Sequence, residues 1–493
     1  MARSITSEAK VLTRHSLIYG MAPVLSGIVG FIMLPIYTRN LTPADYGVLE
    51  LISITTTVLS YIVGVGIQAA VSRFYFDFQE IDERRRVVST AYLGYGSITL
   101  VVVAALLPFS PLLARHILGS ADMGLLFVVA LISLALDIVM QIGFSFLRVE
   151  QKSLFVTTLA ITRTTLALSL NIYFIIIAHK GVMGILLSTL ITSLIFTAIL
   201  TYYTLKKCGP GINLPLLGKM IRFGLPLMPS DISAYVVHAS DRFFLKSYSD
   251  MSITGIYSLG YKIGTLVNQF ITAPFMQIWG PRRYENFEDG DSEAIYARIF
   301  TYFIGLNLFA GLGISLFSKE AIRIIADESY WSAYKVVPIV SLAYVIFSFN
   351  YHFNVGIIMK KATKYIAYVN ISNGALNLAL NFIFIKRYGI WGAAGATLAC
   401  FIYKNALMYF FSNRLHKIQI EWRRLGTLFA VSILCYFLGI LVATGSMWSD
   451  IAVKGLVCLV FPLILYLFKF FTIDELRKAG RLLRPRPAAI RAD

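Results

Sequence analysis

Long apolar segments recur along the whole sequence, and only short polar breaks separate them. The hydrocarbon core of a bilayer is about 30 Å thick, so a helix needs roughly 20 apolar residues to cross it. Charged residues make up only 14% of this chain, whereas they make up about a quarter of a soluble domain. The sequence therefore predicts an all-α protein that crosses a membrane many times and has no large soluble domain.

The length criterion predicts about fourteen transmembrane helices, with ends defined to within about 2–4 residues. The predicted spans are 15–37, 46–71, 87–110, 122–147, 154–178, 181–205, 221–245, 252–278, 297–318, 334–359, 365–386, 389–411, 424–444 and 451–471. The first span is too long for the apolar core of a signal peptide, and no small-residue cleavage site follows it. We expect it to be retained as a helix.

The distribution of basic residues predicts the orientation. With the N-terminus inside, about 29 of the 44 Lys and Arg fall in cytoplasmic loops and about 9 in outer loops, as the positive-inside rule requires. An even number of helices then places both termini in the cytoplasm, and we expect the protein in the cytoplasmic (inner) membrane. Because the net charge of +18 lies mainly in these loops, we expect no nucleic acid among the partners.

Similar residue patterns recur about 208 to 210 residues apart, which indicates an internal duplication. The pattern from Arg163 to Asn171 is echoed from Asn373 to Asn381, and the segment starting at Tyr46 is echoed by the segment starting at Thr254. Each copy holds six helices, and because six is even both copies enter the membrane in the same direction. Two parallel repeats of this kind can rock about a central site, which is typical of transporters.

The repeats define the predicted domains. These are a cytoplasmic N-terminus (1–14), a first lobe (15–205), a cytoplasmic linker (206–220), a second lobe (221–411), an appended pair of helices (412–471) and a basic cytoplasmic tail (472–493). A basic tail is attracted to anionic membrane lipid, which we therefore count among the expected partners.

Prolines interrupt the first and seventh spans at corresponding positions of the two halves. Pro23 lies in the first span, and Pro226 and Pro229 lie in the seventh. Interrupted helices at matched positions are the best sequence indication of where a transporter binds and bends. We predict these three prolines as hinges; proline kinks that serve packing alone are the alternative.

Helical spacing places polar side chains on one face of three predicted spans. These sets are Asp137 with Gln141, then Asp231, Tyr235, His238 and Arg242, and then Asn370, Asn373, Asn377 and Asn381. Ionisable groups at mid-bilayer usually face the interior of a helix bundle or an aqueous cavity. We therefore expect these faces to be turned away from lipid, although His238 alone is also typical of a hydrogen-bonded interior histidine.

Two basic residues lie too deep in their spans to reach the membrane surface easily. Arg163 and Lys262 are nine or ten residues into their helices, which corresponds to a depth of about 14 Å. Two interpretations are open. Either these cations line a central cavity, or they form structural ion pairs with Asp137 or Asp231.

Motifs of covalent catalysis are missing from the sequence. It contains no Walker lysine loop, no HExxH and no Gly-x-Ser-x-Gly elbow, and its four cysteines do not have a metal-ligand spacing. We expect no catalytic residues, no metal and no cofactor.

Motifs spread over nearly the whole chain resemble the polysaccharide-biosynthesis branch of the multidrug, oligosaccharidyl-lipid and polysaccharide exporter (MOP) superfamily. They are Leu41-Thr-Pro-Ala-Asp-Tyr-Gly47, Gly66-Ile-Gln-Ala-Ala-Val-Ser-Arg73, Phe223-Gly-Leu-Pro-Leu-Met-Pro229, Ser240-Asp-Arg242, Gly255-Ile-Tyr-Ser-Leu-Gly-Tyr-Lys262 and Tyr388-Gly-Ile-Trp-Gly392. Each motif is loose, but their order and spacing together are specific.

This resemblance implies a MATE-like, V-shaped pair of six-helix lobes that works by alternating access. It implies flipping of undecaprenyl-pyrophosphate-linked oligosaccharide to the outer leaflet for exopolysaccharide, O-antigen or teichuronic-type polymers, with a polysaccharide polymerase and other biosynthesis proteins as partners. In relatives a cationic lumen receives the anionic headgroup. The positions that fit here are Arg163, Lys262 and Arg242.

The chain departs from that pattern because Asp137 and Asp231 share the expected lumen. They either pair with the cations or carry a coupling ion. From the polar stripes we also expect His238, Asn373 and Asn377 at the substrate-binding cavity.

Three alternatives stay open at this point. A cation-coupled multidrug exporter of the same fold would favour acidic and aromatic cavity residues. A lipid II flippase shares the fold as well. A membrane glycosyltransferase or polymerase would need a large outer loop with catalytic carboxylates or arginines, and the longest predicted outer loop, about residues 319–334, is short.

Overall fold

The protein is seen here as a computed structural model that describes residues 27, 29–285, 292–441, 446–468, 470 and 471. Within these ranges the regular structure is helical, without strands. Ten of the described helical segments are long and apolar enough to cross a membrane, which agrees with the predicted all-α, multi-pass class.

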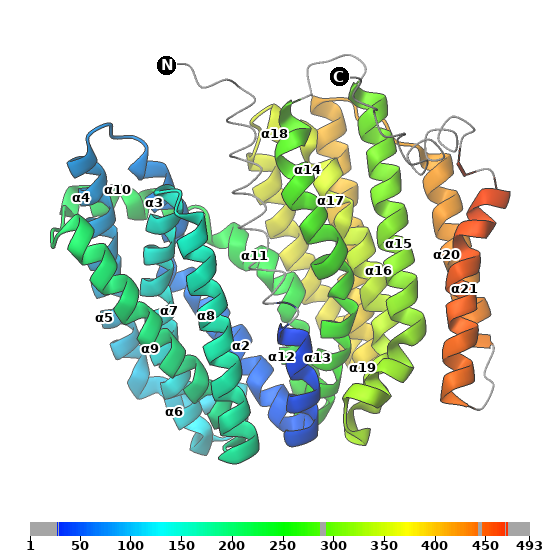
Figure 1. Cartoon of the computed structure of the whole chain (residues 1–493), viewed down its shortest axis with the longest axis horizontal. Coiled ribbons are helices and arrows are strands. Elements are labelled where there is room, and N and C mark those ends of the chain that lie inside the picture. The colour runs from blue at the N-terminus through cyan, green and yellow to red at the C-terminus, as the bar shows by residue number, and fades with distance from the viewer. Residues whose placement is uncertain (1–26, 28, 286–291, 442–445, 469, 472–493) are drawn as a thin grey trace, which may run out of the picture.

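The first lobe is built from helices between residues 29 and 208 (Figure 1). Residues 29–40 are helical, and the elements that follow are α2 (Pro43–Gly64), α3 (Ile67–Tyr75), α4 (Ile81–Thr90), η1 (Ala91–Tyr95), α5 (Gly96–Leu106), η2 (Leu107–Phe109), α6 (Ser110–Ile117), η3 (Ala121–Met123), α7 (Gly124–Val149), α8 (Ser153–Ile172), η4 (Tyr173–Ile177) and α9 (Gly181–Cys208).

The second lobe and the appended pair follow in sequence. Their elements are α10 (Leu214–Gly224), α11 (Met228–Ala239), α12 (Asp241–Tyr248), α13 (Met251–Gly264), η5 (Asn268–Thr272), α14 (Ala273–Glu285), α15 (Ser292–Ile325), η6 (Glu328–Val336), α16 (Val337–Ser348), α17 (Asn350–Phe353), α18 (Val355–Met359), α19 (Lys364–Leu415), α20 (Trp422–Leu441) and α21 (Met447–Leu467).

Helices lie over the predicted spans wherever the structure describes them, but several boundaries differ. The helical stretch predicted as 87–110 runs from Ile81 to Ile117, and α10 occupies part of the predicted linker. The long helix α19 covers two predicted spans, which are separated by a kink at Gly389, where φ is +54°. The count of fourteen stays a prediction, because the seventh and eighth spans are each divided into shorter helices.

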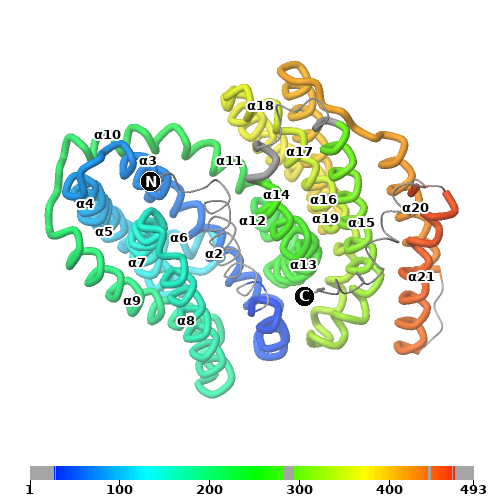
Figure 2. The backbone as a smooth tube through the Cα atoms, turned by 45° about the horizontal axis from the view of Figure 1, so that its top comes forward, coloured from blue at the N-terminus to red at the C-terminus, as the bar shows by residue number. Residues whose placement is uncertain are grey.

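The two lobes lie side by side and diverge toward one end of the molecule (Figures 1 and 2). This is the end at which α4, α10 and α18 lie, beside the loops predicted to be cytoplasmic. At the opposite end α2, α12 and α13 come together, so the pair of lobes has the shape of a V.

The closed end of the V depends on two glycines that the duplication relates to each other. A Cβ atom on Gly47 of α2 would lie 2.3 Å from the carbonyl oxygen of Met251, and one on Gly255 of α13 would lie 1.9 Å from the carbonyl oxygen of Pro43. Both distances are shorter than any side chain tolerates. Since only glycine fits, the two helices cross with their backbones almost in contact, and equivalent helices of the two repeats meet at equivalent residues.

Further contacts between the lobes reinforce this closed end. The Tyr330 hydroxyl of η6 donates a hydrogen bond to the backbone oxygen of Leu41 at 3.0 Å. The Tyr46 and Tyr330 rings meet edge to face with centroids 6.2 Å apart. Arg39 and Thr38 donate to the carbonyl oxygens at the end of α15, at 3.0 and 3.1 Å. These few polar contacts surround a shared apolar core.

Replacing Gly255 by Ala is expected to weaken the closure, because the added methyl group would clash with backbone atoms that cannot rotate away. We expect a cysteine placed at Ser53, in the cleft between the lobes, to react faster with a membrane-impermeant thiol reagent added from the closed side. Gly313→Ala is the matched control, since a Cβ atom at Gly313 would meet nothing within 4 Å. Equal reactivity in Gly255→Ala and in the control would show that the crossing does not hold the lobes together.

Helix interruptions from the two lobes touch at the open side of this crossing. The span of α2 and α3 breaks at Val65 and Gly66, both with positive φ, of +37° and +62°. The span of α10 and α11 breaks at residues 225–227. A Cβ atom on Gly224 would lie 1.9 Å from the Val65 carbonyl oxygen, so the two breaks are packed against each other.

Two of the predicted hinge prolines lie at the second break. Pro226 is inside the interruption, where its missing N–H removes one helical hydrogen bond, and Pro229 is in the first turn of α11. Pro23 lies outside the described residues. That these prolines act as hinges stays a prediction.

A buried ion pair fastens the appended helices α20 and α21 to the second lobe. The Lys454 ammonium of α21 lies 2.6 Å from a Glu320 carboxylate oxygen of α15, and their side chains are 8% and 5% exposed. A surrounding apolar cluster joins α15, α20 and α21. The pair is thus attached at the edge of the molecule farthest from the first lobe (Figure 1).

Candidate functional site

A cavity of about 800 Å³ lies between the two lobes of the described structure. The first lobe contributes most of its wall through α2, α3, α7 and α9, and the second lobe contributes α11 and α13. Four charged side chains line it: Glu50 of α2, Asp137 of α7, Asp231 of α11 and Lys262 of α13. A cavity of this kind between two repeats is where a transporter binds its substrate.

The wall formed by α2 is rich in hydroxyl groups. Its helix starts with a capping box, in which Thr42 and Asp45 bind each other's backbone N–H, and with Pro43 in the first turn. Ser53, Thr56, Thr57, Ser60 and Tyr61 then follow at helical spacing and face the cavity. Such a face suits a ligand that carries many hydroxyl groups, because each hydroxyl can form hydrogen bonds with another.

Lys262 is the predicted site residue that the structure places on the cavity wall as a cation. Its ammonium group lies 3.5 Å from the Tyr46 hydroxyl and 6.0 Å from the centre of that ring. Tyr37 lines the cavity as well. In the described part of the chain Lys262 forms no ion pair, so its charge is available to a ligand.

Arg163 forms an ion pair instead. Its guanidinium of α8 lies 2.9 Å from Asp137, and Ser193 of α9 donates a hydrogen bond to the same carboxylate oxygen at 2.7 Å. Asp137 lines the cavity, whereas Arg163 is not among the residues that do. Of the two interpretations open from the sequence, the structure therefore supports the ion pair for Arg163 and the cavity wall for Lys262.

Replacing Asp137 by Asn is expected to destabilise the first lobe, because Arg163 would lose its counter-ion inside the membrane. We expect a loss of about 1–3 kcal/mol, less than for a fully buried pair, since the side chains of Arg163 and Asp137 are 29% and 34% exposed. Thermal unfolding in detergent measures it, and Asp137→Glu should restore most of the stability. Asp122→Asn, at an exposed position, is the control; equal stability of both Asn variants would contradict the prediction.

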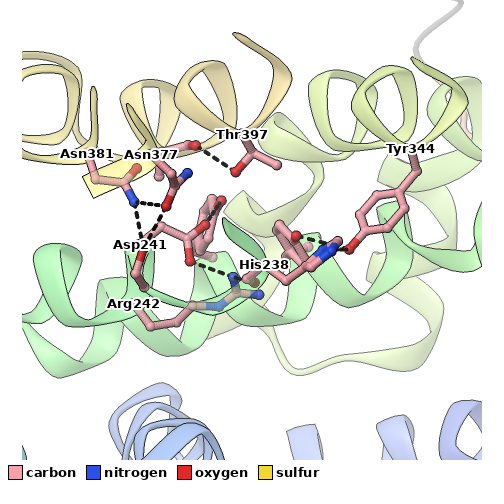
Figure 3. Close-up of polar contacts among 11 residues, drawn as sticks. His238, Asp241, Arg242, Tyr344, Asn377, Asn381 and Thr397 are labelled. Carbon is pink, nitrogen blue, oxygen red and sulfur yellow. Dashed lines mark hydrogen bonds and ion pairs between the residues drawn. The ribbon is translucent and has the colours of Figure 1, made fainter. Parts of the chain in front are cut away.

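The remaining predicted residues gather in a polar network inside the second lobe (Figure 3). Arg242 pairs with Asp241 at 2.6 Å, with side chains 6% and 1% exposed, and its guanidinium lies 3.9 Å from the centre of the Tyr261 ring. A ring nitrogen of His238 lies 2.9 Å from the Tyr344 hydroxyl. Arg242 and His238 thus lie within the lobe, and neither is among the cavity-lining residues.

The asparagines of α19 belong to this same network. Asn377 accepts a hydrogen bond from Ser240 at 2.8 Å and another from Asn381 at 3.0 Å. Asn373 is 2% exposed and lies on the buried side of the same helix. Asn377 therefore links α19 to Ser240, between α11 and α12, and neither Asn373 nor Asn377 is among the cavity-lining residues.

Glu50 is a cavity residue that the sequence reasoning missed. It lies one helical turn after Tyr46, near the predicted start of its span, and a carboxylate there is common at a membrane surface. The available signal was its spacing: Glu50, Ser53, Thr57 and Tyr61 follow at three- and four-residue steps on one face of α2.

Solved structures of several membrane transporters resemble this fold. A structure of the lipid II flippase MurJ in an inward closed conformation has a TM-score of 0.69 and 15% identity, and the match covers 92% of this chain and 98% of that one. An inward-facing MATE family multidrug resistance transporter of the MOP superfamily has a TM-score of 0.64 and 15% identity, with 84% and 99% covered. A MOP superfamily transporter from Pyrococcus furiosus, whose structure is described by the reverse polarity of its binding pocket, has a TM-score of 0.59 and 16% identity, with 85% and 96% covered.

These likenesses show that the chain has the fold of the MOP superfamily. A search of curated protein sequences found no match. The sequence model of one family does match, over residues 12–286, which is more than half of the chain. The chain belongs to this family, which is described as polysaccharide biosynthesis protein.

Proposed function

We propose that this protein is a flippase that moves undecaprenyl-pyrophosphate-linked oligosaccharide from the inner to the outer leaflet of the cytoplasmic membrane. The observation that carries the proposal is the cavity of about 800 Å³ between the lobes, which combines a hydroxyl-rich wall with Lys262, a cation that forms no ion pair within the described residues. Membership of a polysaccharide biosynthesis family supports it. Sugars and a phosphate group would find complementary partners in one site.

The physical need for such a site is the cost of moving charge through hydrocarbon. Transferring an ion from water into a medium of low dielectric constant costs on the order of 20 kcal/mol by an idealised Born estimate. A water-filled cavity removes most of that cost for the pyrophosphate and the sugars, while the prenyl chain stays in lipid. Lys262 would hold the phosphate by a charge-assisted hydrogen bond. The process makes and breaks no covalent bond, so we propose no catalytic residue.

Alternating access is the proposed cycle. The described state is closed where α2 and α13 cross and diverges at the other end (Figure 1). With the orientation predicted from the basic loops, this state receives substrate from the cytoplasm. In the next step the contacts around Tyr330 and Leu41 would break, and the cytoplasmic ends of the two lobes would come together. The cavity would then open to the outer side of the membrane and release the substrate there.

The carboxylates give two candidate positions for a coupling ion. The Asp137 carboxylate already forms an ion pair with Arg163 and accepts a hydrogen bond from Ser193. Asp231 is exposed to the cavity and forms no ion pair within the described residues. We propose Asp231 as the better placed group to bind a cation or proton during the cycle.

The decisive experiment is reconstitution of the protein in vesicles with a labelled lipid-linked oligosaccharide. We expect the label to become accessible at the opposite leaflet, at a rate far above that in protein-free vesicles. Transport that does not exceed this background would overturn the proposal. Co-purification with a polysaccharide polymerase would test the proposed partnership with other biosynthesis proteins.

Export of cationic compounds is a second candidate, and the acidic side chains of the cavity favour it. Glu50 and Asp231 are carboxylates that form no ion pair with a basic side chain within the described residues. The same vesicles loaded with a fluorescent organic cation separate the two functions, because a drug exporter would move the cation and leave the lipid-linked sugar in place.

A further inference from the structure

Most of the Ser and Thr hydroxyl groups on the described cavity wall already donate a hydrogen bond within the protein. Among the described residues, six Ser and Thr line the cavity, and five of them donate a hydrogen bond to a carbonyl oxygen of their own helix: Thr56, Thr57, Ser60, Ser133 and Thr189. Their distances range from 2.7 to 3.0 Å. A hydroxyl that donates in this way offers only its lone pairs to a ligand. These side chains therefore present hydrogen-bond acceptors to the cavity.

The charged side chains reinforce this acceptor character. Asp137 is neutralised by Arg163, which leaves Glu50 and Asp231 against the single cation Lys262 among the described residues that line the cavity. Carboxylates accept hydrogen bonds and donate none when ionised. Gln68, Gln141, Tyr37 and Tyr61 add side chains that can donate as well as accept hydrogen bonds. The asymmetry of the described wall therefore lies in its charge, since two carboxylates without an ion pair face one cation.

Acceptors and negative charge together decide which sugars such a wall can bind. A neutral sugar supplies a hydroxyl donor at almost every carbon, and an amino sugar adds an ammonium donor. A uronic acid replaces one donor by a carboxylate, which is repelled by Glu50 and Asp231. A buried carboxylate that is neither paired nor hydrogen-bonded is costly.

We propose that this cavity selects lipid-linked glycans made of neutral or amino sugars and discriminates against glycans that carry carboxylates. Glu50 and Asp231 are the specificity-determining residues, and Lys262 binds the phosphate group of the substrate. The inference rests on the flippase function proposed above and narrows its substrate class.

The test uses two synthetic substrates that differ in one sugar. Both carry the same prenyl pyrophosphate and the same first two neutral sugars, and the third sugar is glucose in one and glucuronic acid in the other. The sugars are radiolabelled, and translocation in reconstituted vesicles is followed by their oxidation with periodate, which attacks vicinal diols and does not cross the bilayer. We expect the neutral substrate to be translocated at least about tenfold faster than the uronate, because Glu50 and Asp231 repel the carboxylate of the uronate.

Two single variants assign this selectivity to the carboxylates. In Glu50→Gln, which keeps the proposed coupling residue Asp231, the ratio of uronate to neutral translocation should rise about threefold. Asp231→Asn should raise the same ratio about threefold in its residual translocation. Glu83→Gln is the matched control, because it removes an exposed carboxylate on α4 outside the cavity and should leave the ratio unchanged.

The outcomes separate this inference from the proposed function. Equal translocation of both substrates by the native protein would overturn the selectivity while keeping the flippase. An unchanged ratio in Glu50→Gln would remove Glu50 from the role, and an unchanged ratio in Asp231→Asn would remove Asp231. Translocation of neither substrate by the native protein would overturn the flippase, and the selectivity with it.

Discussion

Replacing Lys262 by Glu is expected to abolish translocation of lipid-linked oligosaccharide while the protein remains folded in the membrane. Lys262 is the cation of the described cavity wall that is free of an acidic partner. A hydrogen bond to a charged group contributes about 1.5–3 kcal/mol, so Lys262→Ala alone should slow translocation roughly 10- to 100-fold. Charge reversal adds repulsion of the phosphate and should reduce the rate further.

The conservative variant and a surface variant make this prediction specific. Lys262→Arg should keep most of the activity, because a guanidinium also binds phosphate. Lys360→Glu reverses an exposed charge between α18 and α19 and should flip at the native rate. Translocation by Lys262→Glu within twofold of that control, measured in reconstituted vesicles, would remove Lys262 from the site.

Replacing Lys454 by Met is expected to cause the largest loss of stability among single changes in the appended helices. The substitution leaves the Glu320 carboxylate buried without its partner, and breaking a buried pair in this way costs about 3–5 kcal/mol. The 2.6 Å contact and the low exposure of both side chains make the pair inaccessible to compensating water. Thermal unfolding in detergent should show a clear fall in Tm.

The double variant Glu320→Leu with Lys454→Met should recover most of that stability, because two apolar side chains replace two charges in an apolar cluster. A double-mutant cycle then gives the coupling between the two residues. A double variant as unstable as Lys454→Met would mean that the loss comes from packing around Lys454 and not from the unpaired carboxylate.

The sequence predicted the helices well because the bilayer imposes a length on them. Apolar segments of about twenty residues leave few alternatives to a membrane helix. The duplication was also readable, and Gly47 and Gly255, which it matched, meet at the crossing of α2 and α13. The interruptions were predicted where proline marked them, at Pro226, but not at Val65, because a β-branched residue with positive φ has no sequence signature.

The site was harder to predict because spacing identifies a helix face but not what covers that face. Asp231 and His238 share one face of α11 by spacing, yet Asp231 lines the cavity and His238 contacts Tyr344 of α16. The lobes diverge, so a single face meets the cavity at one level and a neighbouring helix at another. Arg163 was misleading for a related reason, since its depth indicated an interior partner without distinguishing a ligand from Asp137.

The contact between the two helix interruptions makes the halves of the protein mechanically dependent. Because the Val65 carbonyl fills the space that a side chain at Gly224 would need, neither break can straighten without displacing the other. Bending in one repeat is thereby coupled to bending in the other through the close contact at Gly224. A larger residue at position 224 would separate the two interruptions. The two lobes would then bend independently of each other, even though the residues of the cavity are unchanged.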